Sequence, residues 1–270
     1  MTPLPFLAVL RLAGPDAVTF LQGQVTNDVR LLADGRTQLA AVNTPQGRVI
    51  ALLRLREAGD SIFGLLPRDL ADAAATHLCR YVLRAKVMVS VDERPLVRLE
   101  AGEAAPAGAV VFQYDPGRRV ALTTGDAIAH GDDDLEGARW VAEDVAAGQP
   151  QVTAATSGQF VAQMLNLDLL DGISFQKGCY TGQEIVARTQ HLGRIKRRTL
   201  RYRSPGDGLP APMSGVLAGD QKVGDVLTSA RIDGAVELLA VVSLEAADQP
   251  LRLADGRTIE RLPLPGIAPA

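Results

Sequence analysis

The sequence predicts an α+β protein followed by a separate, mostly β domain. Up to about residue 193, segments with helical periodicity alternate with short apolar runs typical of strands. Beyond that point, short strand-like runs are broken by turn pairs at residues 219–220, 233–234 and 255–256, a spacing that favours a small β-barrel or sandwich. The chain has 270 residues, 47% hydrophobic and 22% charged, and can bury one large core or two to three smaller ones.

The first segments predict a strand, a short helix, and a second strand that follows a turn. The N-terminal stretch MTPLPFLAVLRLAG has a short apolar run, which Arg11 interrupts, and no basic stretch precedes it. We therefore expect a strand here and not a secretion signal. Residues 14–24 predict a short helix. Residues 45–47, Pro-Gln-Gly, predict a turn that opens a mostly apolar strand, with Arg54 and Arg56 on one of its sides.

The middle of the chain predicts two further helices, separated by strands and a polar stretch. We expect a helix from Pro67 to about Tyr81, strands at 86–93 and 95–102, and a helix within residues 138–150 that is ended by Gly148 and Pro150. A further turn is indicated at residues 115–117. The acidic run 132–134 lacks the alternating oxygen ligands of a calcium loop, so we expect it to be a solvated loop.

Charge, cysteine and histidine content argue against several classes of protein. The formal net charge is −3, which does not indicate a global nucleic-acid-binding surface. Cys79 and Cys179 lie far apart in the sequence, and the three histidines have unrelated spacings, so we expect free thiols and no structural zinc or other metal site. No run approaches the roughly 18 apolar residues that a membrane span needs. We expect a cytoplasmic protein without a membrane segment.

The stretch FQKGCYTGQE, residues 175–184, carries the most local information. Thr181 and Glu184 fit a capping box at the start of a helix that reaches Gly193. Cys179 precedes that start and follows Lys177, and both a helix N-terminus and a nearby lysine favour a thiolate. The residues alone leave two interpretations open: a reactive thiol, or a small buried residue in a tight turn.

This loop belongs to a longer series of segments that resembles a known family. KGCYTGQE, followed by VAR and LGRIKRR, resembles the signature of the YgfZ-type folate-binding proteins, relatives of the glycine-cleavage T-protein (GcvT) superfamily. FLQGQVTNDV, PQGR, YVLRAKV and TSGQF…NLDLLDGISFQKGCYTGQE resemble further family segments in the same order, from about residue 10 to residue 200. The resemblance implies a GcvT-like ring of two interleaved α+β subdomains plus a small C-terminal β-barrel, with a folate in the central cavity.

The resemblance also implies domain limits, a cofactor and a cellular role. The folate-binding region would span residues 1–193, with its second subdomain at roughly 46–137, and the barrel would span 194–270. The cofactor would be tetrahydrofolate or a one-carbon derivative, and the partners would be iron–sulfur proteins or their assembly factors. The protein would support assembly or repair of iron–sulfur enzymes, including tRNA-modifying ones.

Two residues of the loop are candidates for a functional role: Cys179 as the functional thiol and Lys177 as the residue that prepares it. The motif residues that carry over from the family are Lys177, Gly178, Cys179, Tyr180, Gly182, Gln183 and Glu184.

Five residues outside this loop are candidate folate contacts, and each has a structural alternative. Trp140 can stack on a pterin or pack under its helix, and its place in the family pattern favours ligand contact. Asn27, Asp28 and Asn166 suit the polar edge of a pterin, or the capping of their own backbone. Arg188 suits a folate carboxylate, or an ion pair with a glutamate one turn earlier.

Two other functions stay open beside this one. An aminomethyltransferase of the T-protein type needs a carboxylate near the folate nitrogens, and no matching motif here carries the T-protein's catalytic aspartate. A scaffold that binds a partner protein is the third alternative. The basic segment over residues 194–203 predicts a solvated strand edge, and direct RNA binding is not expected because only Tyr202 offers a stacking ring there.

Overall fold

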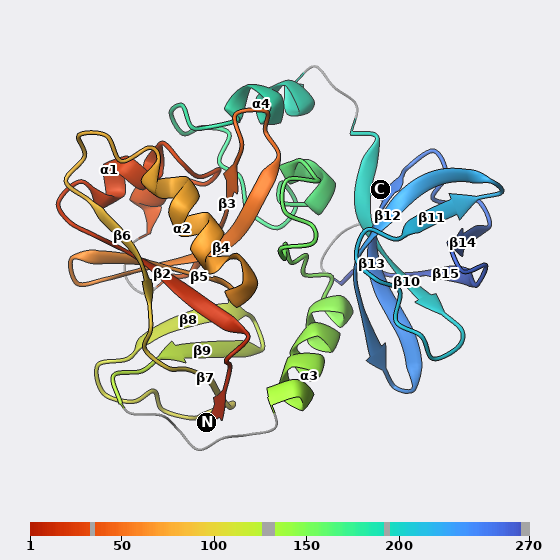
Figure 1. Ribbon diagram of the computed structural model, residues 1–270, viewed down its shortest axis with the longest axis horizontal. Helices are drawn as coiled ribbons and strands as arrows, with labels where there is room; N and C mark the ends of the chain where they lie inside the picture. Colours follow the sequence, from red (N-terminus) through yellow and green to blue (C-terminus); the bar gives the residue numbers. More distant parts are fainter. Residues whose placement is uncertain (33–35, 126–132, 192–194, 266–270) are drawn as a thin grey trace.

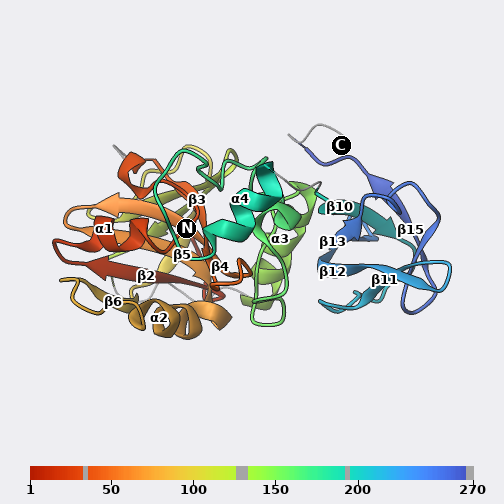
Figure 2. The same cartoon turned by 90° about the horizontal axis from the view of Figure 1, so that it is seen from above.

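Three β-sheets organise the chain. The computed structural model describes residues 1–32, 36–125, 133–191 and 195–265 (Figure 1). A five-stranded and a four-stranded sheet lie together at one end of the molecule, and a closed β-barrel forms the other end. Helix α3 and the segment that follows it lie between these two ends in both views (Figures 1 and 2).

The five-stranded sheet is antiparallel and has the order β3-β4-β5-β2-β6. Its strands are β2 (Leu7–Ala13), β3 (Gln38–Asn43), β4 (Val49–Ala58), β5 (Ser61–Pro67) and β6 (Met88–Asp92). The turn predicted at residues 45–47 joins β3 to β4, and Gly47 adopts the positive φ of +71° that such a turn requires. The strands predicted at the N-terminus, after this turn and at 86–93 are confirmed.

The four-stranded sheet has the order β1-β7-β9-β8 and contains two strands that the sequence pattern did not reveal. Its strands are β1 (Thr2–Pro3), β7 (Leu96–Leu99), β8 (Val110–Asp115) and β9 (Arg118–Leu122). Strands β8 and β9 form a hairpin around the predicted turn, where Asp115 Oδ1 accepts hydrogen bonds from the amides of Gly117 and Arg118. Alanine and glycine dominate the residues before β8, and they obscured the alternation of buried and exposed side chains.

The predicted helices are confirmed, with one correction. The α-helices are α1 (Ala17–Gln22), α2 (Ala71–Cys79), α3 (Asp133–Ala146) and α4 (Gln183–His191), and the 3-10 helices are η1 (Val29–Leu31), η2 (Arg68–Leu70) and η3 (Ala162–Leu165). The expectation of a solvated loop over 132–134 is wrong for Asp133 and Asp134, which form the start of α3. Acidic residues are favourable there, because the helix dipole is positive at its N-terminus. Asp132, Leu192 and Gly193 lie outside the described residues.

The C-terminal strands close into the predicted small barrel, in the order β10-β13-β12-β11-β14-β15. They are β10 (Arg197–Ser204), β11 (Gly215–Ala218), β12 (Gln221–Ile232), β13 (Ala235–Ser243), β14 (Leu251–Leu253) and β15 (Thr258–Leu262). Strand β10 pairs with both β13 and β15, so it is not an edge strand. The division of residues 1–193 into two subdomains stays a prediction.

The basic residues of β10 are neutralised within the protein, which corrects the expectation of a solvated edge. The ion pairs are Arg197–Asp225, Arg198–Asp168, Arg201–Glu237 and Arg203–Glu237. Glu237 is 0% exposed and accepts from two arginines. Pairing of β10 with β13 places Glu237 beside its two arginines, whereas Asp225 comes from β12 and Asp168 from the segment after η3, so these ion pairs cannot be read from β10 alone. Arg194 lies outside the described residues.

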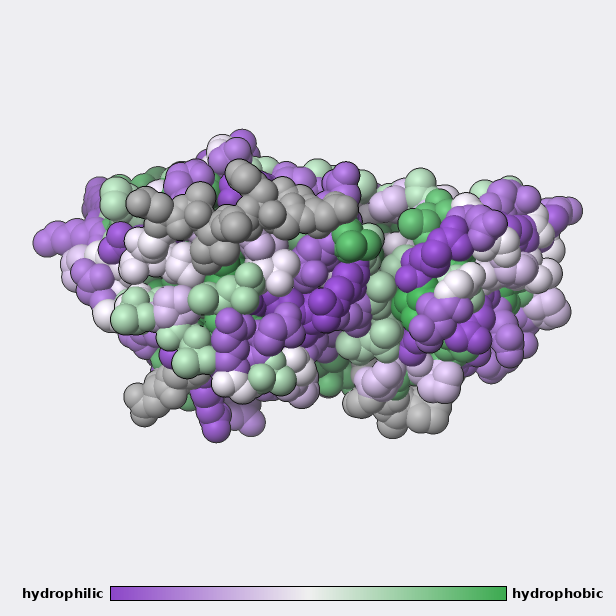
Figure 3. Space-filling view, turned by 90° about the horizontal axis from the view of Figure 1, so that it is seen from below, coloured by the Kyte–Doolittle hydropathy of each residue, from purple (hydrophilic) through white to green (hydrophobic). Residues whose placement is uncertain are grey.

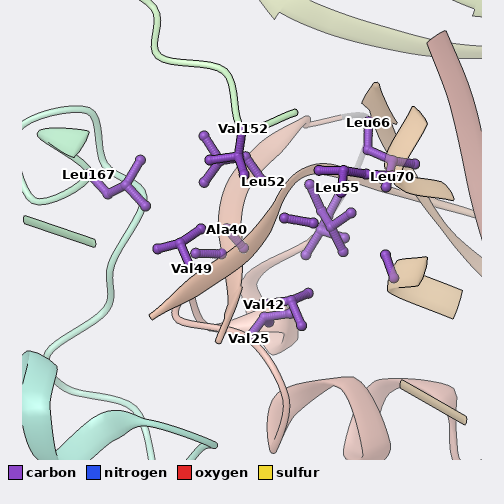
Figure 4. Close-up of a cluster of buried hydrophobic side chains, with 14 of the residues drawn as sticks. Val25, Ala40, Val42, Val49, Leu52, Leu55, Leu66, Leu70, Val152 and Leu167 are labelled. Carbon is purple, nitrogen blue, oxygen red and sulfur yellow. The ribbon is translucent and has the colours of Figure 1, made fainter. Parts of the chain in front are cut away.

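The five-stranded sheet is covered on both faces, because successive side chains of a strand point to opposite sides. On one face, residues of β3 and β4 meet Val152 and Leu167, which come from the segment after α3 (Figure 4). On the other face, Val9, Phe63 and Leu65 pack against the four-stranded sheet. Packing on both faces of the five-stranded sheet thus holds β4 in a fixed position relative to β8 of the four-stranded sheet.

Apolar surface is limited on the face shown in Figure 3, where small green areas are separated by purple polar side chains. Within the described residues, no helix is both long enough and apolar enough to cross a membrane.

Candidate functional site

A cavity of about 540 Å³ opens where four parts of the chain meet. Its wall combines Asn27, Leu31 and residues 36–39 at the start of β3, Arg54 of β4, the β8–β9 hairpin, and residues 170–176, which lead into the cysteine loop. Small-molecule sites in proteins commonly have volumes of about 300–1,000 Å³. The cavity is therefore large enough for one cofactor-sized molecule.

Tyr114 forms a rigid part of the cavity wall and lies against two arginines. The Arg54 guanidinium carbon is 3.4 Å from the centre of the Tyr114 ring, and that of Arg118 is 4.6 Å away. Arg54 Nε also donates to the Tyr114 carbonyl oxygen at 3.1 Å. Cation–π attraction and this hydrogen bond together hold the ring and the Arg54 head in one place.

Helix α3 fixes the hydroxyl end of Tyr114. The hydroxyl donates to Asp144 Oδ2 at 3.0 Å, and burial raises the pKa of Tyr114, so the hydroxyl stays protonated. Arg118 binds the other oxygen of Asp144 at 2.6 Å and also pairs with Asp115. The charge of Arg118 is thus compensated by carboxylates on both sides of the hairpin.

Trp140 packs under its helix instead of lining this cavity. It is 2% exposed and contacts Phe6, Tyr114 and the arginines of the same cluster. It borders a separate, mostly apolar pocket. Trp140 is not among the residues that line the 540 Å³ cavity, where Tyr114 lies instead, and its role as a ligand contact stays a prediction.

Asn27 is the one predicted folate contact that lines the cavity. Its Nδ2 donates to the carbonyl oxygens of Leu39 and Asp171, at 2.9 and 2.7 Å, and its Oδ1 accepts from the amide of Asp28. These bonds join β3 to the segment that leads into the cysteine loop. Asn27 therefore positions two walls of the cavity.

Asp28, Asn166 and Arg188 make structural contacts and are not among the residues that line the cavity, so their folate contacts stay predictions. Asp28 caps η1 and pairs with Arg30, which lowers its pKa to about 2. Asn166 ends η3 with a left-handed φ of 58°, and its side chain donates to the Thr199 carbonyl oxygen. The side chain of Arg188 is 61% exposed and pairs with Glu184 at 2.6 Å, as the i,i+4 spacing predicts.

Lys177 anchors the cysteine loop to the backbone of an earlier segment of the chain. It is 5% exposed, and its Nζ donates to the carbonyl oxygens of Gln22, Val25 and Asn27 at 2.6–2.8 Å. These bonds use all the donors of an ammonium group. Its charge is thus directed at the backbone around Asn27, and its proposed action on the Cys179 thiol stays a prediction. Burial lowers the pKa of Lys177 to about 8.

Cys179 is exposed between residues that anchor the loop. Tyr180 is buried, with its ring 4.9 Å from Lys177 Nζ, and burial raises its pKa to about 12. The Thr181 amide donates to the Gly23 carbonyl oxygen, and its hydroxyl contacts Gln24 instead of completing the predicted capping box with Glu184. Helix α4 begins at Gln183, so Cys179 lies four residues before it and not in its first turn. The thiol is at the surface.

Two motif glycines explain the close packing of distant segments. Gly182 has a φ of +80°, and a Cβ there would lie 2.6 Å from the Thr44 carbonyl oxygen and 2.9 Å from Gly47 Cα. A Cβ on Gly47 would lie 2.7 Å from Ile185 Cβ. The turn before β4 and the turn before α4 thus contact each other directly, and no other residue fits at either position without displacement.

Sequence reasoning missed Arg54 and Tyr114 as site residues. A signal for Arg54 was available, because it is a charged residue inside the apolar strand ALLRLRE, and such residues are rarely buried without a role. Tyr114 comes from a strand that was not predicted. Within the described residues, no three His, Cys, Asp or Glu side chains gather in a way that could hold a metal.

Known structures identify the fold. No protein-family model matches the chain. A solved glycine cleavage system aminomethyltransferase T from Bartonella henselae superposes with a TM-score of 0.73, over 98% of this chain and 85% of that one, at 13% sequence identity. The chain has a GcvT-like fold. The architecture that the sequence resemblance implied, with its small C-terminal barrel, is thereby confirmed.

Proposed function

We propose that this protein binds tetrahydrofolate or a one-carbon derivative in the 540 Å³ cavity, and that it supports iron–sulfur enzymes, including tRNA-modifying ones. The cavity carries the proposal. Its wall holds a buried guanidinium and a fixed asparagine within a GcvT-like fold, and the similar structure is that of an aminomethyltransferase.

The residues present suit a folate, which has a flat polar ring and an acidic tail. Leu31 and Phe175 line the cavity and are 65% and 39% exposed, so they offer apolar contact for an aromatic ring at its mouth. Gln38 also lines it, and its buried Oε1 accepts no hydrogen bond from the described residues, so it is available to a donor on the edge of a pterin. A bound folate would itself supply the one-carbon chemistry, and the protein would bind and orient it.

Calorimetric titration with 5-formyltetrahydrofolate tests the binding. We expect saturable heat with a stoichiometry of one. Calorimetry is preferable to tryptophan fluorescence, because Trp140 lies outside the cavity wall. Absence of saturable binding would overturn the proposal at its first step.

Cys179 is the residue through which we propose that the protein acts on its partners. The chain has two cysteines, whereas iron–sulfur clusters are usually held by four thiolates, so a cluster bound here would need ligands from another protein. An exposed thiol on an anchored loop is accessible to such a partner. The partners we propose are iron–sulfur proteins or their assembly factors.

Complementation tests this role, because Cys79 is an equally exposed control. In a strain that lacks the gene, we expect Cys79→Ser to restore the activity of an iron–sulfur enzyme. Cys179→Ala and Cys179→Ser should fail while keeping wild-type stability and folate affinity. Full rescue by both Cys179 variants would remove the thiol from the mechanism.

The second candidate function is aminomethyl transfer, because the similar structure is that of an aminomethyltransferase. Two carboxylates line the cavity: Asp115, which is paired with Arg118, and Asp171. The assay is formation of methylenetetrahydrofolate from an aminomethylated carrier protein. Product formation that Asp171→Asn abolishes would favour this function over the accessory role.

A further inference from the structure

Arg54 is a buried cation without a carboxylate partner. The residue is 4% exposed and lines the cavity. Its Nε donates to the Tyr114 carbonyl oxygen, and no carboxylate among the described residues lies within ion-pair distance of it. The other donors of its guanidinium are therefore left for the contents of the cavity.

Arg118 lies in similar surroundings to Arg54, but its charge is compensated by carboxylates. Both arginines lie against the Tyr114 ring, but Arg118 pairs with Asp115 and Asp144 and does not line the cavity. A guanidinium taken out of water is costly unless an anion and further hydrogen bonds replace its hydration. Arg118 obtains that compensation from two direct ion pairs, whereas Arg54 has one carbonyl oxygen, one ring face and the charge of Asp144 beyond ion-pair distance.

We propose that Arg54 binds a carboxylate of the cavity's ligand. This inference rests on the proposed function for the identity of that ligand, in which the carboxylate is the acidic tail of a reduced folate. A guanidinium is suited to this group because it can donate two parallel hydrogen bonds to the two oxygens of a carboxylate. Tyr114 keeps the guanidinium plane in a fixed orientation, so the ligand does not have to order it.

The position of Arg54 in the sheet provides a test from within the protein. Leu39 of β3 is its direct cross-strand partner and also lines the cavity. Side chains of such partners lie close together on the same face. The substitution Leu39→Glu therefore places a carboxylate beside Arg54, and Leu39→Gln adds a side chain of the same size without the charge.

The experiment measures calorimetric affinities of the full-length protein for three probes. 5-Formyltetrahydrofolate carries both the ring and the carboxylates, 6-methyltetrahydropterin carries the ring alone, and glutamate carries the carboxylates alone. We expect Arg54→Gln to weaken binding of 5-formyltetrahydrofolate at least tenfold and to change binding of 6-methyltetrahydropterin less than twofold. Arg54→Lys, which keeps the charge but not the paired donors, should lie between.

Comparison of Leu39→Glu with Leu39→Gln separates the effect of the new charge from that of a changed side-chain shape. Leu39→Glu should weaken binding of 5-formyltetrahydrofolate at least fivefold more than Leu39→Gln does, because the new carboxylate occupies Arg54. Raising the salt concentration should weaken folate binding to the wild-type protein more than to Arg54→Gln. Thermal unfolding of each variant without ligand verifies that it is folded.

Each outcome decides a different statement. If the wild-type protein binds 5-formyltetrahydrofolate but Arg54→Gln weakens the folate and the pterin equally, Arg54 merely supports Tyr114 and the inference fails. If it binds glutamate in an Arg54-dependent way but not the folate, the carboxylate site stands and the folate function fails. If the wild-type protein binds none of the three probes, both proposals fail. Equal effects of the two Leu39 variants would also contradict the inference.

Discussion

The two ends of the molecule compensate their charged side chains in different ways. In the barrel, the partly buried Arg201 and the exposed Arg203 share Glu237, a carboxylate that is 0% exposed. Around the cavity, Lys177 and Arg54 are 5% and 4% exposed, and among the described residues neither has a carboxylate within ion-pair distance. Lys177 is satisfied by three backbone carbonyl oxygens, and Arg54 is only partly satisfied.

This difference shows that the density of positive charge does not locate the binding site. The basic run of β10 is the most visible cationic feature of the sequence, and its described arginines are neutralised by the protein itself. Arg54, one of the two arginines in the mostly apolar strand β4, lines the cavity with no carboxylate among the described residues within ion-pair distance. Burial without compensation is therefore the stronger indication of a ligand site.

The largest loss of stability is expected from removing the Glu237 carboxylate, which would leave the barrel's arginines without this partner. Glu237→Ala removes the carboxylate and leaves two arginines beside an uncharged interior, so the free energy of unfolding should fall by about 3–5 kcal/mol. Urea denaturation measures this loss. The matched variant Glu237→Gln, which keeps an acceptor, should lose less. A loss below about 1 kcal/mol for Glu237→Ala would mean that these pairs do not stabilise the barrel.

Removing the buried ammonium group of Lys177 is expected to cause the next largest loss of stability. Lys177→Met leaves three carbonyl oxygens without a donor and should lower the free energy of unfolding by about 3 kcal/mol. Lys196 is exposed, so Lys196→Met is the matched control and should stay within about 0.5 kcal/mol of wild type. Equal effects of the two substitutions would contradict the anchoring role of Lys177.

The pH dependence of stability tests how Lys177 is held. Burial lowers its pKa from the ordinary value of 10.5 to about 8 in the folded protein. Between these values the unfolded chain binds more protons, so the contribution of this group to stability increases as pH rises from about 8 toward 10.5. We expect the stability difference between wild type and Lys177→Met to widen over this window. A constant difference would show that the three carbonyl oxygens offset the effect of burial.

The smallest effect is expected for an exposed pair. Arg188 and Glu184 have side chains that are 61% and 78% exposed, and such pairs contribute about 0.5 kcal/mol or less. Arg188→Gln should therefore leave both the urea midpoint and the affinity for 5-formyltetrahydrofolate close to wild type. A tenfold loss of affinity would support Arg188 as a folate contact and weaken the distinction between buried and exposed cations drawn above.

Secondary-structure elements were predictable where interactions between residues close in sequence determine them. Helix α1 and strand β4 follow from side-chain periodicity and from a Pro-Gln-Gly turn, and the barrel follows from short strands between regular turns. The cysteine loop was predicted to be a junction between loop and helix, and it is one. The role of Lys177 was not predictable, because its acceptors lie about 150 residues earlier in the chain.

The sequence by itself determined the periodic elements, the turn glycines and the presence of a thiol in an irregular segment before a helix. The tertiary structure decided which charges are compensated: Arg201 meets Glu237 only when β10 pairs with β13, and Arg54 meets Tyr114, 60 residues away, only when β4 packs against the β8–β9 hairpin. Electrostatic and hydrogen-bond partners act over a few ångströms, so only the folded chain establishes which cation remains available to a ligand.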